Sequence, residues 1–207
     1  MSTIAITPLT TKLRDTAFDL ASEMFTRSST LHAALRVDLE TYRHALRPSF
    51  DAMAAQDLSL VAISPEGRLL GCLIATDMYH ALSDGPPTGP YPEIAALTHS
   101  LTRSYHARHP FGPGEVVLVD MAVTCPEAHG LGLYQAMRAH MELIARAAGF
   151  HLIVGELSSQ ATQHVVLNKM GHRAMVEIRF QAFDWNGTRP FASITSPTSI
   201  ILAEGTL

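Results

Sequence analysis

The stretch VVLVDMAVTCPEAHGLGLYQAMRAHMELIARAAG, residues 116–149, decides the fold of this chain. Its first part, Val116–Thr124, is an apolar run interrupted by Asp120, which is typical of a central strand buried on both faces. Its last part, from about residue 133 to residue 148, carries apolar side chains at helical spacing. The short segment between them, His129-Gly130-Leu131-Gly132, turns the chain from strand into helix.

A glycine loop that leads into a helix is suited to binding an anion. Gly130 and Gly132 carry no side chains that would hold a phosphate away from the backbone. The helix that follows directs its unpaired N–H groups and the positive end of its dipole at the loop. A tight turn without a ligand would need the same glycines, so both interpretations stay open here. Nucleotide motifs are not matched, because Gln135 stands where a third glycine would fall and the Walker lysine is missing.

The flanking sequence predicts helices, a hairpin and further strands. Helical periodicity covers residues 11–25 and 31–53, with an interruption at Arg47-Pro48, where proline disfavours helix in the preceding residue. Apolar runs on both sides of Ser64-Pro65-Glu66-Gly67 predict an antiparallel hairpin. After the central helix, the sequence predicts strands at 151–157, 174–183 and 191–202, and a short helix that ends at Gly171.

Two motifs in this order of elements resemble those of the GNAT superfamily of acyl-CoA N-acyltransferases. The segment Glu127-Ala128-His129-Gly130-Leu131-Gly132 is similar to the cofactor motif Gln/Arg-x-x-Gly-x-Gly/Ala. Lys169-Met170-Gly171-His172 is similar to the second signature, Lys-x-Gly-Phe. The resemblance covers about residues 55–185, and residues 25–31 are distantly similar to the arylalkylamine N-acetyltransferase branch. It implies one α/β (α+β) domain over residues 1–207, with a mixed, mostly antiparallel central sheet flanked by helices and a cofactor-binding core at about 116–172.

The chain departs from the family pattern at several positions. Glu127 takes the place of Gln or Arg, and its carboxylate would repel phosphate unless it points away. Leu167 stands where the family often has a tyrosine acid, and the acidic residue of the arylalkylamine branch would fall near Ser29. The interval from Val123 to Gly130 is one residue longer than the commonest pattern, which indicates a bulge in the strand. These departures affect the catalytic mechanism more than cofactor binding.

Acetyl-CoA is the acyl donor that the resemblance implies. In the family, the strand before the loop separates from its neighbour, and its free backbone groups hold the pantetheine arm and the thioester carbonyl. The loop and the start of the helix hold the pyrophosphate. The cofactor-binding residues implied in this way are Met121, Ala122, Val123, His129, Gly130, Leu131, Gly132, Leu133, Tyr134 and Gln160.

Two carboxylates are candidates for the catalytic base. Asp120 and Glu156 each interrupt an apolar strand, where burial would raise the pKa of the carboxyl group toward neutral pH. A carboxylate paired with a neighbouring arginine is the alternative for both. Ser158 is a third catalytic candidate, although Ser158, Ser159 and Thr162 also suit the N-cap of a helix. No metal site is expected, because the histidines lack ligand spacing.

Charge, apolar run length and cysteine positions argue against several classes of partner and location. The net charge of −4 and the sequence pI near 6.2 argue against a nucleic-acid partner. No apolar run approaches the length of about 20 residues that crosses a membrane, and the first residues do not resemble a secretory signal. Cys72 and Cys125 lie far apart in expected strands, which fits two buried thiols in a reducing cytoplasm.

The sequence therefore predicts direct transfer of an acetyl group from acetyl-CoA to a primary amine of a small molecule, with arylalkylamines or polyamines suggested by resemblance alone. A non-catalytic acyl-CoA-binding sensor and a protein lysine or N-terminal acetyltransferase are the alternatives on the same fold. An assembly module is a further alternative, in which the strand expected at 191–202 pairs across the edge of a homodimer.

Overall fold

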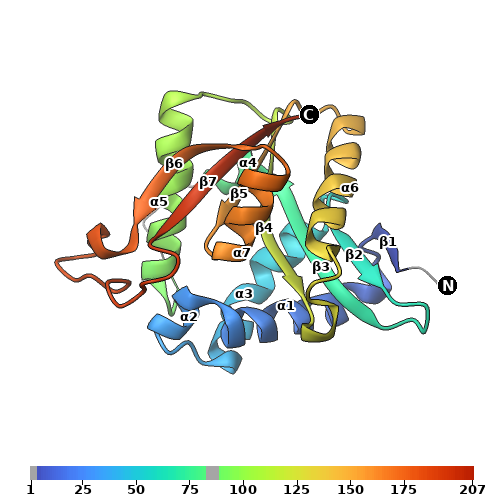
Figure 1. Cartoon of the computed structure of the whole chain (residues 1–207), viewed down its shortest axis with the longest axis horizontal. Helices are drawn as coiled ribbons and strands as arrows, with labels where there is room; N and C mark the ends of the chain where they lie inside the picture. Colours follow the sequence, from blue (N-terminus) through green and yellow to red (C-terminus); the bar gives the residue numbers. More distant parts are fainter. Residues whose placement is uncertain (1–3, 83–88) are drawn as a thin grey trace.

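The computed structural model describes residues 4–82 and 89–207 of the chain. A seven-stranded sheet with the order β1-β2-β3-β4-β5-β7-β6 runs through its centre (Figure 1). Every neighbouring pair is antiparallel except β4 and β5, which run parallel. This confirms the expected mixed, mostly antiparallel sheet. The strands are β1 (Ala5–Pro8), β2 (Leu60–Ile63), β3 (Leu69–Asp77), β4 (Val116–Thr124), β5 (Leu152–Leu157), β6 (Arg173–Arg179) and β7 (Ser199–Thr206).

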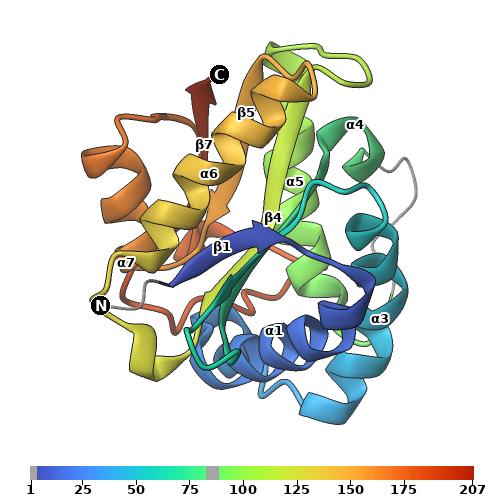
Figure 2. The same cartoon turned by 90° about the vertical axis from the view of Figure 1, so that its right-hand side faces the viewer.

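Helices cover both faces of the sheet, as the views in Figures 1 and 2 show. Helix α6 packs on one face, where Met137 and Met141 meet Val117 and Val119 of β4. On the other face, α1 and α3 pack against β3, and α5 packs against β6 and β7. The longer helices are α1 (Arg14–Ser28), α3 (Leu39–Ala54), α5 (Pro92–Arg108) and α6 (Leu133–Ala147); the shorter ones are α2 (Thr30–Ala34), α4 (Met78–Ala81) and α7 (Gln160–Gln163).

Shorter helical turns link several of these elements. A 3-10 turn at η2 (Pro126–Ala128) lies between β4 and the glycine loop, and a π-helical segment, η3 (His164–Lys169), continues α7. Two further 3-10 turns are η1 (Thr11–Leu13) before α1 and η4 (Phe180–Ala182) after β6.

Strands β4 and β5 pair over only part of their length. Their ladder begins at Val116 and Leu152 and ends at Val119 and Gly155. Beyond that point β4 remains paired with β3, whereas β5 remains paired with β7. The sheet therefore opens between two strands at its middle, as the resemblance implied.

A β-bulge lies at the point where the two strands separate. Ile74 pairs with Met121 and Ala75 pairs with Val119, so Asp120 is the extra residue on β4. A bulge redirects the side chain of its extra residue. This bulge lies ahead of Val123 and so outside the interval from Val123 to Gly130 whose length indicated one; that interval instead contains η2.

Two predictions about the last strand of the chain are wrong. The strand expected at 191–202 begins only at Ser199, and the residues before it form turns. Strand β7 then pairs with β5 on one side and β6 on the other. It is not an edge strand, so it offers no free edge for the proposed pairing across a dimer.

The break predicted in the second helical stretch is also misplaced. Helix α3 runs through Pro48, and the interruption comes at residues 35–38, between α2 and α3. Asp38 begins α3 by accepting a hydrogen bond from the N–H of Thr41, at 2.8 Å. Strand β1 was not predicted, because four residues that include a proline give no clear strand pattern.

Membrane-spanning character is not found in the described residues: none of their helices combines the length and the apolarity that crossing a bilayer requires.

Candidate active site

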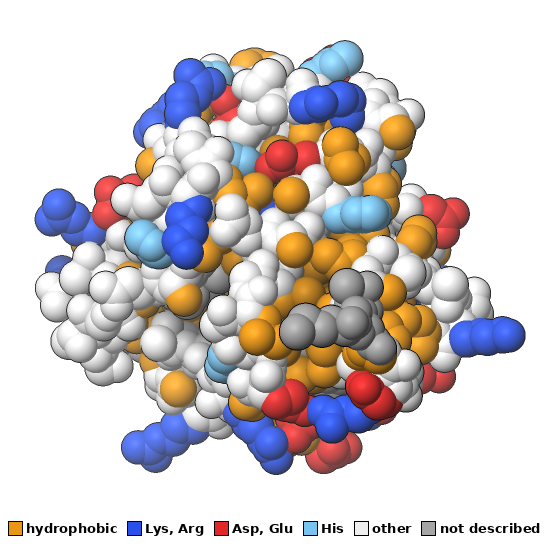
Figure 3. Space-filling view, turned by 45° about the vertical axis from the view of Figure 1, so that its right-hand side comes forward, with side chains coloured by type: hydrophobic (Ala, Val, Ile, Leu, Met, Phe, Trp, Pro, Cys, Tyr) orange, Lys and Arg blue, Asp and Glu red, His pale blue; other side chains and the backbone are white. Residues whose placement is uncertain are grey.

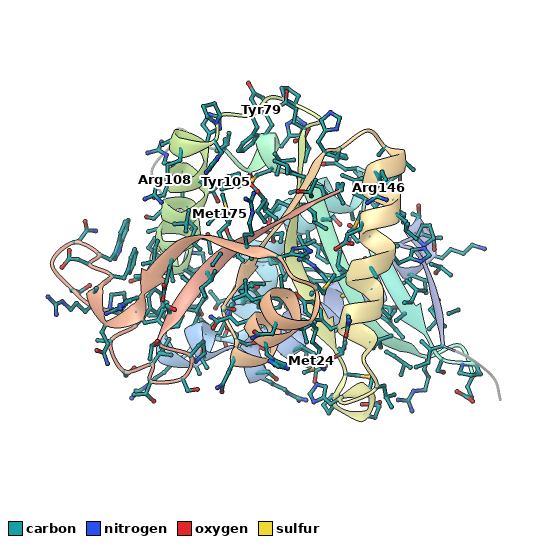
Figure 4. All side chains as sticks on the ribbon, turned by 45° about the horizontal axis from the view of Figure 1, so that its top comes forward. Met24, Tyr79, Tyr105, Arg108, Arg146 and Met175 are labelled. Carbon is teal, nitrogen blue, oxygen red and sulfur yellow. The ribbon has the colours of Figure 1, made fainter. Side chains whose placement is uncertain are left out.

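A cavity of about 1520 Å³ lies where β4 and β5 separate. Its walls come from α1, α2 and α3, the start of α5, the loop before α6, the first turns of α6, and the segment after β5. Met24 of α1, labelled in Figure 4, is one of its lining residues. The cavity therefore reaches both the glycine loop and the two carboxylates that the sequence indicated.

The glycine loop has the geometry of an anion site. Gly130 and Gly132 both have positive φ, at 79° and 71°, a conformation that side-chain-bearing residues rarely adopt. Gly132 is the N-cap of α6 and no side chain caps the helix. The N–H groups of the first turn consequently have no acceptor within the helix. Gly130, Gly132 and Leu133 line the cavity, so these donors lie beside it.

Glu127 forms an ion pair with Arg68, which precedes β3. A backbone hydrogen bond first, a hydrogen bond with the Cys125 thiol second, and then the charge of Arg68 hold the pKa of the Glu127 carboxyl below its usual range. Its charge is therefore compensated within the protein, which removes the objection that it would repel phosphate. His129 also lines the cavity, and its Nε2 atom lies 3.3 Å from the carbonyl oxygen of Thr124.

Strand β4 supplies the wall next to the loop. Met121, Ala122 and Val123 line the cavity, and the edge of β4 that faces β5 has no ladder partner at these residues. Backbone N–H and C=O groups on such an edge are available to a ligand. The three residues thus have the setting that the resemblance implied.

Asp120 and Glu156 come together at the separation of the strands. Both line the cavity, and among the described residues neither has an ion-pair partner. The Asp120 side chain is open to the cavity yet surrounded by protein, and this burial raises the pKa of its carboxyl to about 6. Burial first, and the charge of Asp120 second, raise the pKa of Glu156 to about 8. Thr102 Oγ1 donates a hydrogen bond of 3.4 Å to Glu156 Oε1.

These two carboxyl groups titrate as a pair. Because the Asp120 charge raises the pKa of Glu156, the pair carries about one negative charge between pH 6 and pH 8. A site of this kind attracts a cation and still accepts a proton above neutral pH.

An aromatic wall lies beside the carboxylates. The rings of His32 and Tyr42 are 4.7 Å apart, edge to face, and the rings of His32 and Phe25 are 5.5 Å apart. Burial lowers the pKa of His32 to about 4, so its imidazole is neutral at neutral pH. Burial and the charge of Asp120 raise the pKa of Tyr42, which keeps its hydroxyl protonated. All three residues line the cavity and none was identified from the sequence.

Arg138 is a further residue that sequence analysis missed. Its guanidinium is fully buried beneath Gly155, where an added Cβ would lie 2.5 Å from Nη1. Its Nη2 lies 3.4 Å from His172 Nδ1, and Nε and Nη1 have no hydrogen-bond partner. Tyr134 lines the cavity and lies close to this guanidinium. A charged residue between Met137 and Met141, on the inner face of an amphipathic helix, was the available signal.

The remaining candidates divide into two groups. Ser158, Ser159 and Thr162 all line the cavity, and Ser159 and Thr162 also form a capping box at the start of α7, as one of the alternatives predicted. Gln160 does not line it, and instead accepts a hydrogen bond of 3.3 Å from Ser196 Oγ. Leu131 is 62% exposed and also lies outside the lining.

A mixed sheet that opens between two parallel strands, beside a glycine loop at the start of a helix, is the fold of the GNAT acyltransferases. The expected fold is confirmed, because solved structures with this architecture superpose on nearly the whole chain. No protein-family model and no curated protein matches the sequence.

Three solved structures illustrate the likeness. The chain is similar to the C-terminal condensation domain of Ebony in complex with beta-alanyl-dopamine, with a TM-score of 0.89, 16% identity and 100% of both chains covered. It is similar to arylalkylamine N-acetyltransferase 2 from Aedes aegypti, with a TM-score of 0.78, 15% identity and 98% of both chains covered. A putative acetyltransferase from Salmonella typhimurium with its cofactor acetyl-CoA gives a TM-score of 0.58 at 14% identity, covering 100% of this chain and 95% of that chain.

Proposed function

We propose that this protein transfers an acetyl group from acetyl-CoA to the primary amine of a small aromatic molecule. One observation carries the proposal: a single cavity joins an uncapped, glycine-preceded helix start to a pair of carboxylates that share one negative charge. The first feature suits a pyrophosphate and the second suits an ammonium group.

The residues at the loop fit an acyl-CoA. Gly130, Gly132 and Leu133 offer backbone donors at the positive end of α6, and the charge of Glu127 is compensated by Arg68. The unpaired edge of β4 at Met121–Val123 offers further backbone groups to an extended pantetheine arm. Bound acetyl-CoA would supply the activated acyl group.

The chemistry required of the protein follows from the reaction. An ammonium group must lose a proton before its nitrogen can attack the thioester carbon. The amide bond then forms as the carbon–sulfur bond breaks, and the leaving thiolate takes up the second proton that the nitrogen gives up. The negative charge on Asp120 attracts the ammonium, and the Asp120–Glu156 pair accepts its proton. Backbone N–H groups on the free edge of β4 stabilise the negative charge that develops on the carbonyl oxygen.

An aromatic amine suits the cavity better than a polyamine. Among the described lining residues, Asp120 and Glu156 are the only carboxylates, so a second cationic group would have no acidic partner. Phe25, His32 and Tyr42 instead present rings beside them. Among the similar proteins, the Ebony domain in complex with beta-alanyl-dopamine and arylalkylamine N-acetyltransferase 2 from Aedes aegypti are named for aromatic amines, whereas a polyamine N-acetyltransferase from Drosophila melanogaster is named for the other class. The choice of an aromatic amine therefore rests on the residues that line the cavity.

Calorimetric titration with acetyl-CoA tests the donor site. Gly130→Trp places a large side chain at the loop and is expected to abolish binding. Gly187→Trp is the matched control, because Gly187 also has a positive φ, at 78°, with open space around its Cβ position, but lies outside the cavity. Equal binding by both variants would contradict the proposed donor site.

Release of free thiol from acetyl-CoA, in the presence of a panel of primary amines, tests the reaction. We expect turnover with aromatic amines and little with polyamines. A sensor remains the rival, because Leu167 is packed against Leu157 at the position where the family often has a tyrosine acid. Tight acetyl-CoA binding without turnover on any amine would favour the sensor.

A further inference from the structure

A ring nitrogen of His32, in the cavity wall, has no hydrogen-bond partner in the protein. His32 is 4% exposed, and its Nε2 atom makes no hydrogen bond. The other ring nitrogen, Nδ1, lies 2.9 Å from Ser29 Oγ, so one side of the ring is already held. An unmatched ring nitrogen at this depth costs stability unless a ligand completes it.

The surroundings of His32 select the kind of ligand group. Tyr42 and Phe25 flank the imidazole with aromatic rings, and such walls favour a flat ring in the ligand. Because Ser29 Oγ can either donate to Nδ1 or accept from it, Nε2 is a donor in one tautomer and an acceptor in the other. A hydroxyl group complements both cases, since it donates and accepts.

The His32 ring lines the same cavity as Asp120 and Glu156. Tyr42 is near both His32 and Asp120, because its ring contacts that of His32, and burial first and the charge of Asp120 second raise the pKa of its hydroxyl. A ligand that spans this path carries a cationic nitrogen at Asp120 and Glu156 and an aromatic ring toward His32.

The geometry points to a hydroxyl-recognition subsite at His32, which binds the ring hydroxyl of a phenolic alkylamine and selects it over the amine without that hydroxyl. The inference rests on the proposed function for its choice of an amine ligand. It goes beyond that function by naming the residue and the chemical group that set the preference. In the reaction His32 is a positioning residue, since the acetyl group is transferred at the other end of the ligand.

Two amines that differ by one hydroxyl group test the subsite: tyramine and 2-phenylethylamine. Their binding is measured by calorimetry on the full chain, and their kcat/KM values by thiol release from acetyl-CoA. A hydrogen bond to a buried partner is worth about a ten-fold to hundred-fold preference. We expect the wild-type protein to bind tyramine better by such a factor.

His32→Phe keeps an aromatic ring and removes both nitrogens, so it should reduce the preference to about one. It should leave the binding of 2-phenylethylamine nearly unchanged. His44→Phe, at another histidine that lines the same cavity, is the matched control and should keep the preference. His32→Gln, which again offers a donor and an acceptor, should recover part of it.

The outcomes separate the two proposals. Equal binding of both amines by the wild-type protein, or binding of neither, would overturn the subsite. A hydroxyl preference that survives in His32→Phe would also overturn it. A preference lost in His32→Phe, with no turnover of either amine, would support the subsite and contradict the acetyl-transfer function.

Discussion

Asp120, the extra residue of the bulge in β4, is one of the two carboxylates that line the cavity. Asp120 interrupts an apolar strand in the sequence, and a charge in that setting was the signal that identified it. Glu156 gave the same signal, and both residues line the cavity. His32 and Arg138 gave weaker signals, because each lies in a helix, where a single polar residue usually faces water. Their burial depends on neighbours that are distant in the sequence.

Asp120→Asn should move the pH dependence of acetyl transfer to lower pH. Burial first, and the charge of Asp120 second, raise the pKa of Glu156 to about 8, so removal of that charge lowers the pKa, while burial still keeps it above the ordinary value of 4.5. The rise of kcat/KM with pH should therefore begin earlier than in the wild-type protein. Comparison of the two pH profiles with one amine gives the shift.

Glu156→Gln is the companion variant. It removes the group that titrates near pH 8 and should lower kcat/KM about 10²–10⁴-fold if the pair is the base. Superimposable profiles for wild type and Asp120→Asn would show that the two carboxylates do not act as a coupled pair.

Strands β3 and β4 lie close together at Gly71 and Val123, and Val123 lines the cavity. Gly71 allows this, because an added Cβ would lie 2.8 Å from the carbonyl oxygen of Val123. Gly71→Ala should therefore destabilise the protein by about 1–3 kcal/mol and weaken acetyl-CoA binding, since Val123 lines the cavity. Urea unfolding and calorimetry measure the two effects. Gly112→Ala, where the nearest atom is 3.7 Å away, is the control and should stay within about 0.5 kcal/mol.

Helix α5 is tied to β7 by a buried hydrogen bond. Tyr105 points from α5 toward the sheet (Figure 4), and its hydroxyl donates to Glu204 Oε2 at 2.6 Å. Arg173 pairs with the other oxygen of this buried carboxylate. Tyr105→Phe should cost about 1–3 kcal/mol in urea unfolding, because the carboxylate loses a donor in a buried site. Tyr79→Phe, at a side chain that is 43% exposed, should leave stability nearly unchanged.

Element order was predictable because its signals are local. The hairpin turn, the glycine loop and the amphipathic helix each lie within one short segment, and all three are confirmed. The final strand was misplaced because its pairing is non-local: β7 returns between β5 and β6, over 40 residues after β5 and 20 after β6. Turn residues before Ser199 continue the apolar pattern without belonging to the sheet.

The net charge of the chain is −4. On the face shown in Figure 3, Lys, Arg, Asp and Glu side chains lie at several separate places, mostly around its rim. A marked pH dependence of stability between pH 5 and pH 8 is therefore expected to come from buried groups rather than from the surface as a whole.

Glu156 is the group expected to dominate that dependence. Its pKa is about 8 in the folded protein against 4.5 in the unfolded chain, so the folded state binds the proton more tightly. Below pH 4.5 Glu156 is protonated in both states, so it adds no pH dependence to the free energy of unfolding. As pH rises from 4.5 to 8, the unfolded chain ionises first, and the free energy of unfolding should fall by at most about 1.4 kcal/mol per pH unit. Above pH 8 both states are ionised and the decline ends.

Glu156→Gln cannot titrate, so its stability relative to wild type should increase from pH 5 to pH 8 and then level off. Urea unfolding of both proteins at intervals from pH 5 to pH 9 measures this difference, and a difference that is constant with pH would show that Glu156 ionises in the folded protein as readily as in water.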